Sequence, residues 1–168
     1  MDNMEIVLRN WMDSDIENLI QLCTHTDRTY LSGVPFPYRE RDARWYVRFC
    51  SEHEGKTGIF RAIVADGKTV GSISINRLNS LLAKDAQLGF YLLPEYENKG
   101  IMTRATHMIC HMAFHTLDIA RITAPIISNN VASRRVVEKN SFELEGTLRN
   151  AVWKNDRSYD LSIYGKLR

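Results

Sequence analysis

The sequence lacks the features that mark several large classes of protein. No stretch approaches the roughly 18 consecutive apolar residues that a membrane-spanning helix needs. The cysteines, Cys23, Cys50 and Cys110, are few, far apart and without a Cys-x-x-Cys pair, which suits a reducing compartment. The net charge is only +2, and the basic residues are scattered among the acidic ones. This pattern gives no electrostatic footprint for nucleic acid.

Targeting and linker segments are also missing. The N-terminal stretch MDNMEIVLRN is polar and lacks the apolar segment of a secretory signal. With 44% hydrophobic and 25% charged residues, the 168-residue chain is able to bury a globular core. No repeat, low-complexity tract or Pro/Gly/Ser-rich linker divides it. We therefore expect a single domain over residues 1–168, located in the cytoplasm and without a membrane or nucleic-acid partner.

Two common nucleotide-binding motifs are absent. The stretches EGKTG and DGKTV each contain the Gly-Lys-Thr end of a P-loop. A P-loop also needs a glycine five positions earlier, where this chain has Cys50 and Ala62. No G-x-G-x-x-G sequence occurs either, so a dinucleotide-binding fold is unsupported.

Hydrophobic periodicity predicts a mixed chain of strands and helices. The expected order is one strand, two helices, three strands, a helix, a strand, a helix and two strands. The first half follows from four segments: a strand in MEIVLRN, a helix in IENLIQLC after Asp13-Ser14-Asp15, a loop at 24–38, and a helix in YRERDARWYVRFCSEH.

The second half of the chain carries hairpin signals around a central strand–helix–strand unit. Asp66-Gly67 lies between two β-rich runs, and Lys154-Asn155-Asp156 separates the last two. Between them we expect strands in AQLGFYLLP and IARITAPIIS and helices at about 99–116 and in NVASRRVVEK. A parallel pair is expected in the middle and antiparallel pairs at the flanks. The fold class is therefore α/β, with helices on the faces of a mixed sheet.

The helix at 99–116 begins in an unusual way. Its first turn follows Asn98-Lys99-Gly100, which offers few side chains able to cap the unpaired backbone N–H groups of a helix start. Such a start, directly after a strand, favours an anion, and Gly100 leaves room for close approach while Lys99 adds a positive charge. A phosphate group is the expected ligand, although an ordinary strand-to-helix turn would have the same sequence.

Three stretches, in order along the chain, carry a resemblance to a known family: AQLGFYLLPEYENKGIMTRA, ISNNVASRRVVEKNSFELEG and YDLSIYGKL. Residues 87–168 resemble the GNAT acetyltransferase superfamily, and within it the branch that acetylates the N-termini of ribosomal proteins. The first half matches more loosely through VLRNWMDSDIENLIQL and FRAIVADGKTVGSISI. The resemblance covers nearly the whole chain and implies the GNAT acyl-CoA N-acyltransferase fold.

The resemblance implies acetyl-CoA as co-substrate, and no metal is expected. In the family a loop of Gln or Arg, two residues, Gly, one residue, then Gly or Ala wraps the pyrophosphate with backbone N–H groups. This chain matches at Gly100 and departs at Glu97 and Met102. The resemblance also assigns the strand end, Leu92 and Leu93, to the pantetheine arm and the oxyanion of the reaction, and Asn130 to a position near the sulfur. The implied cofactor-binding residues are therefore Leu92, Leu93, Asn98, Lys99, Gly100, Ile101, Met102, Thr103 and Asn130.

The catalytic groups are harder to assign. The resemblance places Ser133 near the sulfur, where its hydroxyl would protonate the leaving thiolate; a hydroxyl at a helix start also commonly bonds the backbone. Related enzymes carry a glutamate where this chain has Gln87 or Val152, and neither can accept a proton. An α-amine has a pKa of roughly 7.7–8.0 and needs less help from a base than a lysine near 10.4. Asp160 and Tyr164 stay as alternative bases.

The acceptor side is implied by the family as well. The loop TYLSGVPFPY and the final hairpin turn between Trp153 and Tyr159 correspond to the walls of the acceptor groove, so Tyr30, Phe36 and Gln87 are the expected substrate-binding residues. In the family a glycine ends the last helix before a phenylalanine. Asn140-Ser141 stands there, and we expect Asn140 to adopt the left-handed conformation.

Two residue clusters have simpler explanations. His107, His111 and His115 recur along one helix flank, but two helical turns separate the outer two by roughly 12 Å, too far to share a metal. Cys110 is expected to be a core residue.

The chain is thus predicted to move an acetyl group from acetyl-CoA to a primary amine by direct attack in a ternary complex. The expected acceptor is a protein N-terminal α-amine. The alternatives are a small-molecule amine such as a polyamine, amino acid or antibiotic-like compound, and a non-catalytic acyl-CoA-binding module. A homodimer is left open.

Overall fold

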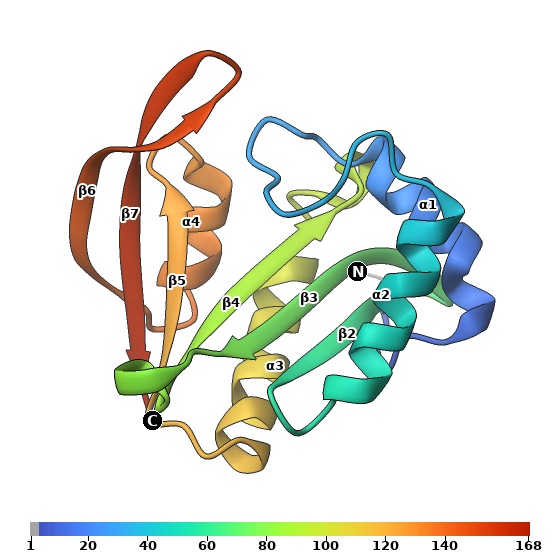
Figure 1. Cartoon of the computed structure of the whole chain (residues 1–168), viewed down its shortest axis with the longest axis horizontal. Coiled ribbons are helices and arrows are strands. Elements are labelled where there is room, and N and C mark those ends of the chain that lie inside the picture. The colour runs from blue at the N-terminus through green and yellow to red at the C-terminus, as the bar shows by residue number, and fades with distance from the viewer. Residues whose placement is uncertain (1–3) are drawn as a thin grey trace.

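The computed structural model describes residues 4–168 and forms one sheet with helices on its faces (Figure 1). The elements follow the predicted order: β1 (Ile6–Arg9), α1 (Ile16–His25), α2 (Glu40–His53), β2 (Gly58–Ala65), β3 (Lys68–Arg77), β4 (Asp85–Leu92), α3 (Ile101–Thr116), β5 (Arg121–Ile127), α4 (Val131–Glu138), β6 (Glu143–Lys154) and β7 (Arg157–Leu167). Short 3₁₀ turns occur at Asp13–Asp15, Ser80–Leu82 and Pro94–Tyr96.

The sheet is mixed, as predicted. Its spatial order is β1-β2-β3-β4-β5-β7-β6. The pair β4–β5 is parallel, since α3 carries the chain back across the sheet between them, and the other neighbours are antiparallel. Strands from both ends of the chain thus belong to one sheet.

Two apolar clusters hold the helices against the sheet. One lies between the sheet and α3 and includes Ile63, Ile73 and Ile109, each fully buried. The other lies on the opposite face, where Leu19 of α1 and Val47 of α2 pack against inward residues of β2. The alternation of strand side chains therefore serves two cores, one on each face. Among the described residues, none of the helices combines the length and apolar character that crossing a bilayer requires.

Both predicted hairpins are confirmed, and their turns have the backbone that the sequence favours. Asp66 and Gly67 both have positive φ, at 46° and 78°, and join β2 to β3. Asn155 and Asp156 do the same between β6 and β7, at 52° and 55°. Positive φ at both central residues is the two-residue turn that matches the twist of paired strands.

The expectation for Asn140 is wrong. Ser141, with φ of 62°, adopts the left-handed conformation after α4. The Asn140 side chain is instead buried, and its Nδ2 donates to the carbonyl oxygens of Val136 at 2.9 Å and Thr103 at 3.1 Å. An amide that links two helices outweighs the local preference of asparagine for positive φ, because its buried N–H groups need acceptors. Asn140 thereby ties the end of α4 to the first turn of α3.

Candidate functional site

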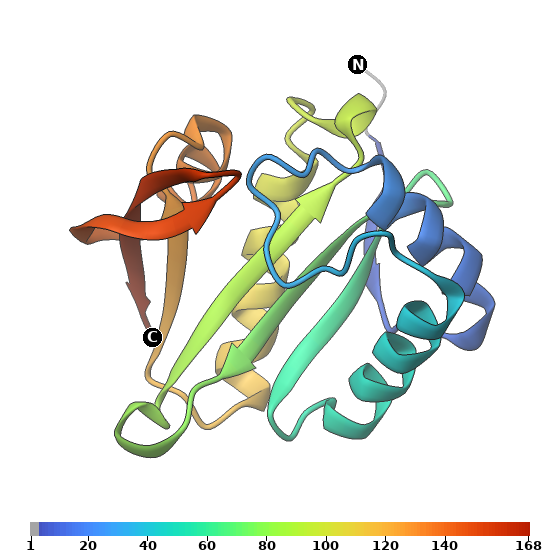
Figure 2. The ribbon, with the colours of Figure 1, turned by 45° about the horizontal axis from the view of Figure 1, so that its top comes forward.

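The strands β4 and β5 separate partway along the sheet (Figures 1 and 2). They pair over three residues only, ending at Gln87 and Thr123. Beyond that point β4 continues to Leu92 with β3 on one side and no strand on the other. The sheet therefore opens into a gap that widens towards the C-terminal ends of both strands.

Backbone alternation decides which groups of β4 face this gap. The Leu93 N–H donates to the Val70 carbonyl at 2.9 Å, and the Leu78 N–H donates to the Asp85 carbonyl at 2.9 Å. On an antiparallel strand, every second residue directs its backbone N–H and C=O groups to the same neighbouring strand. The intervening residues, Leu92 among them, consequently direct their N–H and C=O groups into the gap. Of the two predicted strand-end residues, Leu92 has its N–H available there, whereas the N–H of Leu93 is already used.

The first turn of α3 lies next to the open end of β4. Gly100 caps the helix with φ of 75°, and Asn98 has φ of 58°. A left-handed residue of this kind is readily formed by glycine. An added Cβ at Gly100 would meet nothing within 4 Å, so the space beside it is open.

A row of backbone donors is exposed by this loop. Within residues 4–168, the N–H groups from Asn98 through Thr103 have no hydrogen-bond acceptor, and the next one, of Arg104, bonds to the Gly100 carbonyl at 3.1 Å. Six successive donors at the positive end of a sixteen-residue helix are an arrangement that favours an anion. This is the segment in which the cofactor-binding residues Asn98, Lys99, Gly100, Ile101, Met102 and Thr103 were predicted.

The two departures from the family loop have structural consequences. The Met102 side chain is 7% exposed and packs in the core under α3, so it leaves its own N–H uncovered. Glu97 is exposed. Lys99 places its Nζ 5.2 Å from the Tyr96 ring centroid, a cation–π distance that keeps a positive charge beside the loop. The loop thus combines free donors with a nearby cation.

The start of α4 contributes a second pair of residues. The Asn130 side chain caps the helix, accepting a hydrogen bond from the Ser133 N–H at 3.1 Å. Ser133 is half-buried, and its hydroxyl has no partner within residues 4–168. The Asn130 amide is therefore partly committed to the helix, while the Ser133 hydroxyl is free to act on a ligand. The roles predicted for both residues stay predictions.

The residues that face one another where the gap begins are uncharged, and the carboxylate of Asp85, two residues before Gln87, is bonded to side chains of β5. Gln87 is exposed, lies opposite Asn76 on β3 and opposite Thr123 on β5. Asn76 donates to the Ser74 hydroxyl at 3.2 Å. These side chains can donate and accept hydrogen bonds, but amides and hydroxyls are not bases at neutral pH.

The two alternative bases differ in their hydrogen bonds. Burial raises the pKa of the Tyr164 phenol, which donates to Glu138 at 2.7 Å and accepts from Arg134 at 3.0 Å. Asp160 accepts a hydrogen bond from the Asn150 N–H at 2.8 Å. Val152 lies on β6 and has no titratable group. Tyr164 is therefore held between two charged partners, whereas the Asp160 carboxylate keeps acceptor positions open and stays an alternative base.

Two wall segments meet on the face of the sheet that α1 and α2 cover. The loop between those helices, residues 26–39, is called the acceptor loop below, and residues 153–158 are called the hairpin tip. Lys154 of the hairpin tip donates to carbonyl oxygens of the acceptor loop. A cavity of about 450 Å³ lies between the two segments and is lined in part by Phe36. Tyr30 is half-buried in the same loop. The sequence predicted both wall segments, but it did not indicate that Lys154 connects them.

The other candidate residues from the sequence are Cys110 and the histidines of α3. Cys110 is 2% exposed in the core, as predicted, and burial raises the pKa of its thiol to about 12. The rings of His111 and His115 stack on the exposed side of α3, with their centroids 4.2 Å apart. In the described part of the chain, no three His, Cys, Asp or Glu side chains are grouped as a metal ion would need.

Comparison with known proteins agrees with this architecture. The sequence model of the acetyltransferase (GNAT) domain matches residues 5–143. YdaF of Bacillus subtilis (strain 168) is 32% identical over 171 residues, covering 99% of this chain and 93% of that protein. YjcK of the same organism is 33% identical over 122 residues, covering 70% of this chain and 66% of that protein.

A more distant relative and a solved structure complete the comparison. The spermidine N(1)-acetyltransferase of Escherichia coli (strain K12) is 21% identical over 155 residues, 92% of this chain and 70% of that protein. The ribosomal L7/L12 α-N-protein acetyltransferase RimL, solved with coenzyme A, superposes with a TM-score of 0.84 at 22% identity, covering 96% of this chain and 93% of that one. From the matched domain, the YdaF similarity and the shared fold, the chain belongs to the GNAT family of acetyltransferases.

Proposed function

We propose that this acetyl-CoA-dependent N-acetyltransferase acts on the N-terminal α-amine of a protein, by direct attack in a ternary complex. The observation that carries the proposal is that Gln87 stands where a related enzyme would hold a carboxylate base, and that the neighbouring Asp85 is already bonded to Thr123 and Arg121. An α-amine, with a pKa of roughly 7.7–8.0, is partly neutral at pH 7, whereas a lysine amine near 10.4 is almost fully protonated. A site with glutamine in place of that carboxylate therefore favours α-amines.

The relatives support the same acceptor. YdaF is named as a candidate ribosomal N-acetyltransferase, and RimL is named for acetylating a ribosomal protein at its α-amine. In this proposal residues 1–168 act as one catalytic unit. Family membership also favours an enzyme over the non-catalytic acyl-CoA-binding module.

The cofactor-binding residues are proposed from the free donors. The N–H groups of Asn98–Thr103 would hold the pyrophosphate of acetyl-CoA, with Lys99 adding charge. The Leu92 N–H, which faces the gap, would donate to the thioester carbonyl as the amine attacks. One such donor is typically worth about 2.7–4 kcal/mol in the transition state. Acetyl-CoA supplies the activated acetyl group and a thiolate that leaves.

Ser133 is proposed to relay a proton: its hydroxyl donates to the leaving thiolate and takes up the proton that the attacking amine loses, so the hydroxyl is restored. Its free hydroxyl lies at the start of α4, three residues after Asn130. Replacing Ser133 by alanine is expected to lower kcat by about 100-fold, the lower range for loss of a proton-transfer group, with little change in KM for acetyl-CoA. Ser51→Ala, at an exposed position of α2, is the control. Equal kcat in the two variants would remove Ser133 from the mechanism.

The function is tested with a panel of amines, following release of free thiol from acetyl-CoA. Short peptides with a free N-terminal serine or alanine should be acetylated, and the same peptides with a blocked N-terminus should not. The rate at low peptide concentration should rise with pH up to about 8, as the α-amine loses its proton. Binding of acetyl-CoA without thiol release on any amine would contradict the proposal.

A small polyamine is the second candidate acceptor. The similarity to a spermidine N(1)-acetyltransferase at 21% identity favours it. Spermidine in the same panel decides between the two. A higher kcat/KM for spermidine than for every peptide would replace the α-amine proposal with this one.

A further inference from the structure

The acceptor loop and the hairpin tip come from opposite sides of the gap in the sheet. The acceptor loop joins α1 to α2, which pack on the β2–β3–β4 side. The hairpin tip extends β6 and β7, which lie beyond β5. Figure 2 shows the end of the β6–β7 hairpin beside the loop between α1 and α2, and hydrogen bonds from Lys154 join the two segments. Their contact therefore spans the gap.

Lys154 makes that contact. Its Nζ donates to the Arg28 carbonyl and, at 2.6 Å, to the Leu31 carbonyl. The sequence separation is more than 120 residues in both cases. Two carbonyl acceptors on one ammonium fix the hairpin tip against the turn of the acceptor loop, and hydrogen bonds from a charged donor are among the stronger ones.

The Arg28 side chain links the two ends of the acceptor loop, to which Lys154 also bonds. Its guanidinium donates to the Cys23 carbonyl at 3.4 Å and to the Val34 carbonyl at 3.0 Å, and its Cζ lies 4.7 Å from the Phe36 ring centroid. The two limbs of the loop are thus joined through one side chain. A shift of the Lys154 contact would move the whole loop, including Phe36.

The cavity of about 450 Å³ depends on this arrangement. It is lined by both segments, including Phe36 from the acceptor loop and Asn155 from the hairpin tip. Without the contact, its two walls would belong to separate surface loops. Burial lowers the pKa of Lys154, and the adjacent Arg28 acts in the same direction. The cation is thus held in a partly desolvated position between the walls, where its carbonyl partners satisfy it.

We propose that Lys154 is a positioning residue for the acceptor amine: it fastens the acceptor loop to the hairpin tip and so closes the acceptor side of the gap into a passage. This deepens the proposed function and rests on it. A passage bounded on both sides admits an amine on a narrow, flexible group, such as a chain terminus, in preference to an amine on a folded surface. Lys154 does not touch the reacting atoms.

The experiment compares Lys154→Met with Lys84→Met. Lys84 is exposed and pairs with the exposed Asp118, away from the acceptor loop, so the control makes the same chemical change. Lys154→Arg keeps a cationic donor and should restore much of the wild-type behaviour. Steady-state kinetics use acetyl-CoA and a short peptide with a free N-terminal serine. Amide hydrogen exchange of residues 26–39 is measured on the same proteins without ligand.

Lys154→Met should raise KM for the peptide by about tenfold or more, the loss expected when bonds from a charged donor are removed. KM for acetyl-CoA should change by less than about twofold, because the donors of Asn98–Thr103 are untouched. Exchange in residues 26–39 should become faster in Lys154→Met and stay unchanged in Lys84→Met.

Three results would overturn the proposal. Equal exchange in Lys154→Met and Lys84→Met would show that Lys154 does not fasten the loop. Faster exchange with an unchanged peptide KM would remove its positioning role. A parallel rise in both KM values would make the effect a general loss of structure. If the wild-type protein acetylates no amine, the proposed function fails, while the exchange comparison still decides whether Lys154 holds the loop.

Discussion

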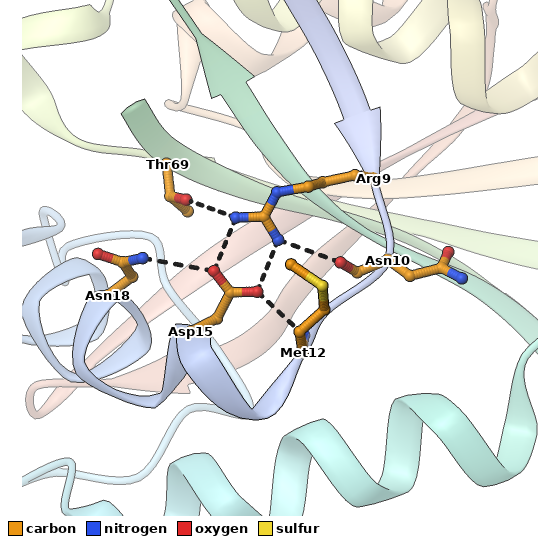
Figure 3. A network of polar contacts seen from close by, with 6 residues as sticks. All are labelled: Arg9, Asn10, Met12, Asp15, Asn18 and Thr69. Carbon is orange, nitrogen blue, oxygen red and sulfur yellow. Dashed lines mark hydrogen bonds and ion pairs between the residues drawn. The ribbon is translucent and has the colours of Figure 1, made fainter. Parts of the chain in front are cut away.

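A polar network at the end of β1 makes a sharp stability prediction (Figure 3). Arg9 binds Asp15 with both terminal nitrogens, at 2.6 Å and 2.7 Å. The Asp15 side chain is only 2% exposed, and it also accepts from the Met12 N–H at 2.9 Å and from Asn18 at 3.3 Å. Arg9 reaches Thr69 on β3 as well, at 3.2 Å. One guanidinium thus joins β1, the start of α1 and β3.

The perturbation is Arg9→Met, which keeps much of the stem and removes the charge. It leaves the Asp15 carboxylate buried without its cation. Breaking a buried pair from one side costs about 3–5 kcal/mol. Because the Arg9 side chain is 31% exposed and Asp15 keeps two other donors, we expect about 3 kcal/mol at neutral pH. For a chain of this length that lowers Tm by roughly 6–12 °C.

The control is Arg44→Met. Arg44 and Glu40 approach to the same 2.6 Å, but their side chains are 62% and 61% exposed. An exposed pair four residues apart on a helix contributes about 0.3–0.5 kcal/mol. The two variants lose a pair of equal length and differ in burial, so their comparison isolates the effect of desolvation.

The pH dependence has a definite sign. Burial raises the pKa of the Asp15 carboxyl, but the hydrogen bonds from Arg9, Met12 and Asn18 outweigh it, and the pKa lies below its ordinary value. A lowered pKa contributes stability that is present above the unfolded-state pKa of about 3.9 and is lost as pH falls through the folded-state value. In Arg9→Met the largest opposing partner is gone, so this contribution disappears.

The difference in stability between wild type and Arg9→Met should therefore be full at pH 7 and shrink below about pH 4. Urea unfolding followed by circular dichroism at both pH values measures it, with the denaturant slope checked for two-state behaviour. The reasoning is refuted if Arg9→Met and Arg44→Met lose the same stability at pH 7. It is also refuted if the Arg9→Met deficit stays constant on acidification.

Two further predictions concern glycines. Gly100→Ala should weaken CoA binding measured by calorimetry, because a left-handed alanine costs about 1–2 kcal/mol and shifts the free donors. The control is Gly55→Ala, since Gly55 has a φ of 71° and Gly100 one of 75°. It should lower stability by a similar amount and leave CoA binding unchanged. Gly165→Ala should lower the unfolding free energy by about 1 kcal/mol, since an added Cβ would lie 2.5 Å from the Glu145 carboxylate and displace it from its partly exposed ion pair. Gly146→Ala, with nothing within 4 Å of the added Cβ, should not show this loss in thermal unfolding.

The order of elements could be predicted because its signals are local. Alternating apolar residues mark the strands, and Asp66-Gly67 and Asn155-Asp156 adopt the positive φ values that their turns require. Asn140 was predicted wrongly because its conformation is decided by a distant partner, the Thr103 carbonyl on another helix. The local preference of asparagine for positive φ is overridden here because its buried amide must find acceptors.

The site could be predicted to a similar extent. The donor loop around Gly100 depends on consecutive residues, so the pattern of a helix without a capping side chain is readable. The contact of Lys154 with the acceptor loop is not readable, because it joins segments more than 120 residues apart. The N–H of Leu93 could not be distinguished from that of Leu92 either, since the difference depends on the register between β3 and β4.

The point at which β4 and β5 separate links this register to the chemistry. At the closed end of the gap, Asp85 of β4 accepts from Thr123 at 2.6 Å and from Arg121 at 3.1 Å, both on β5. Arg121 also bonds to Glu145 of β6, whose side chain lies over Gly165 of β7. Four strands are thus joined where pairing of β4 with β5 stops. Since the free backbone groups of β4 begin beyond that point, this charge cluster holds the strands together where the gap starts, while the register between β3 and β4 decides which N–H groups face the gap.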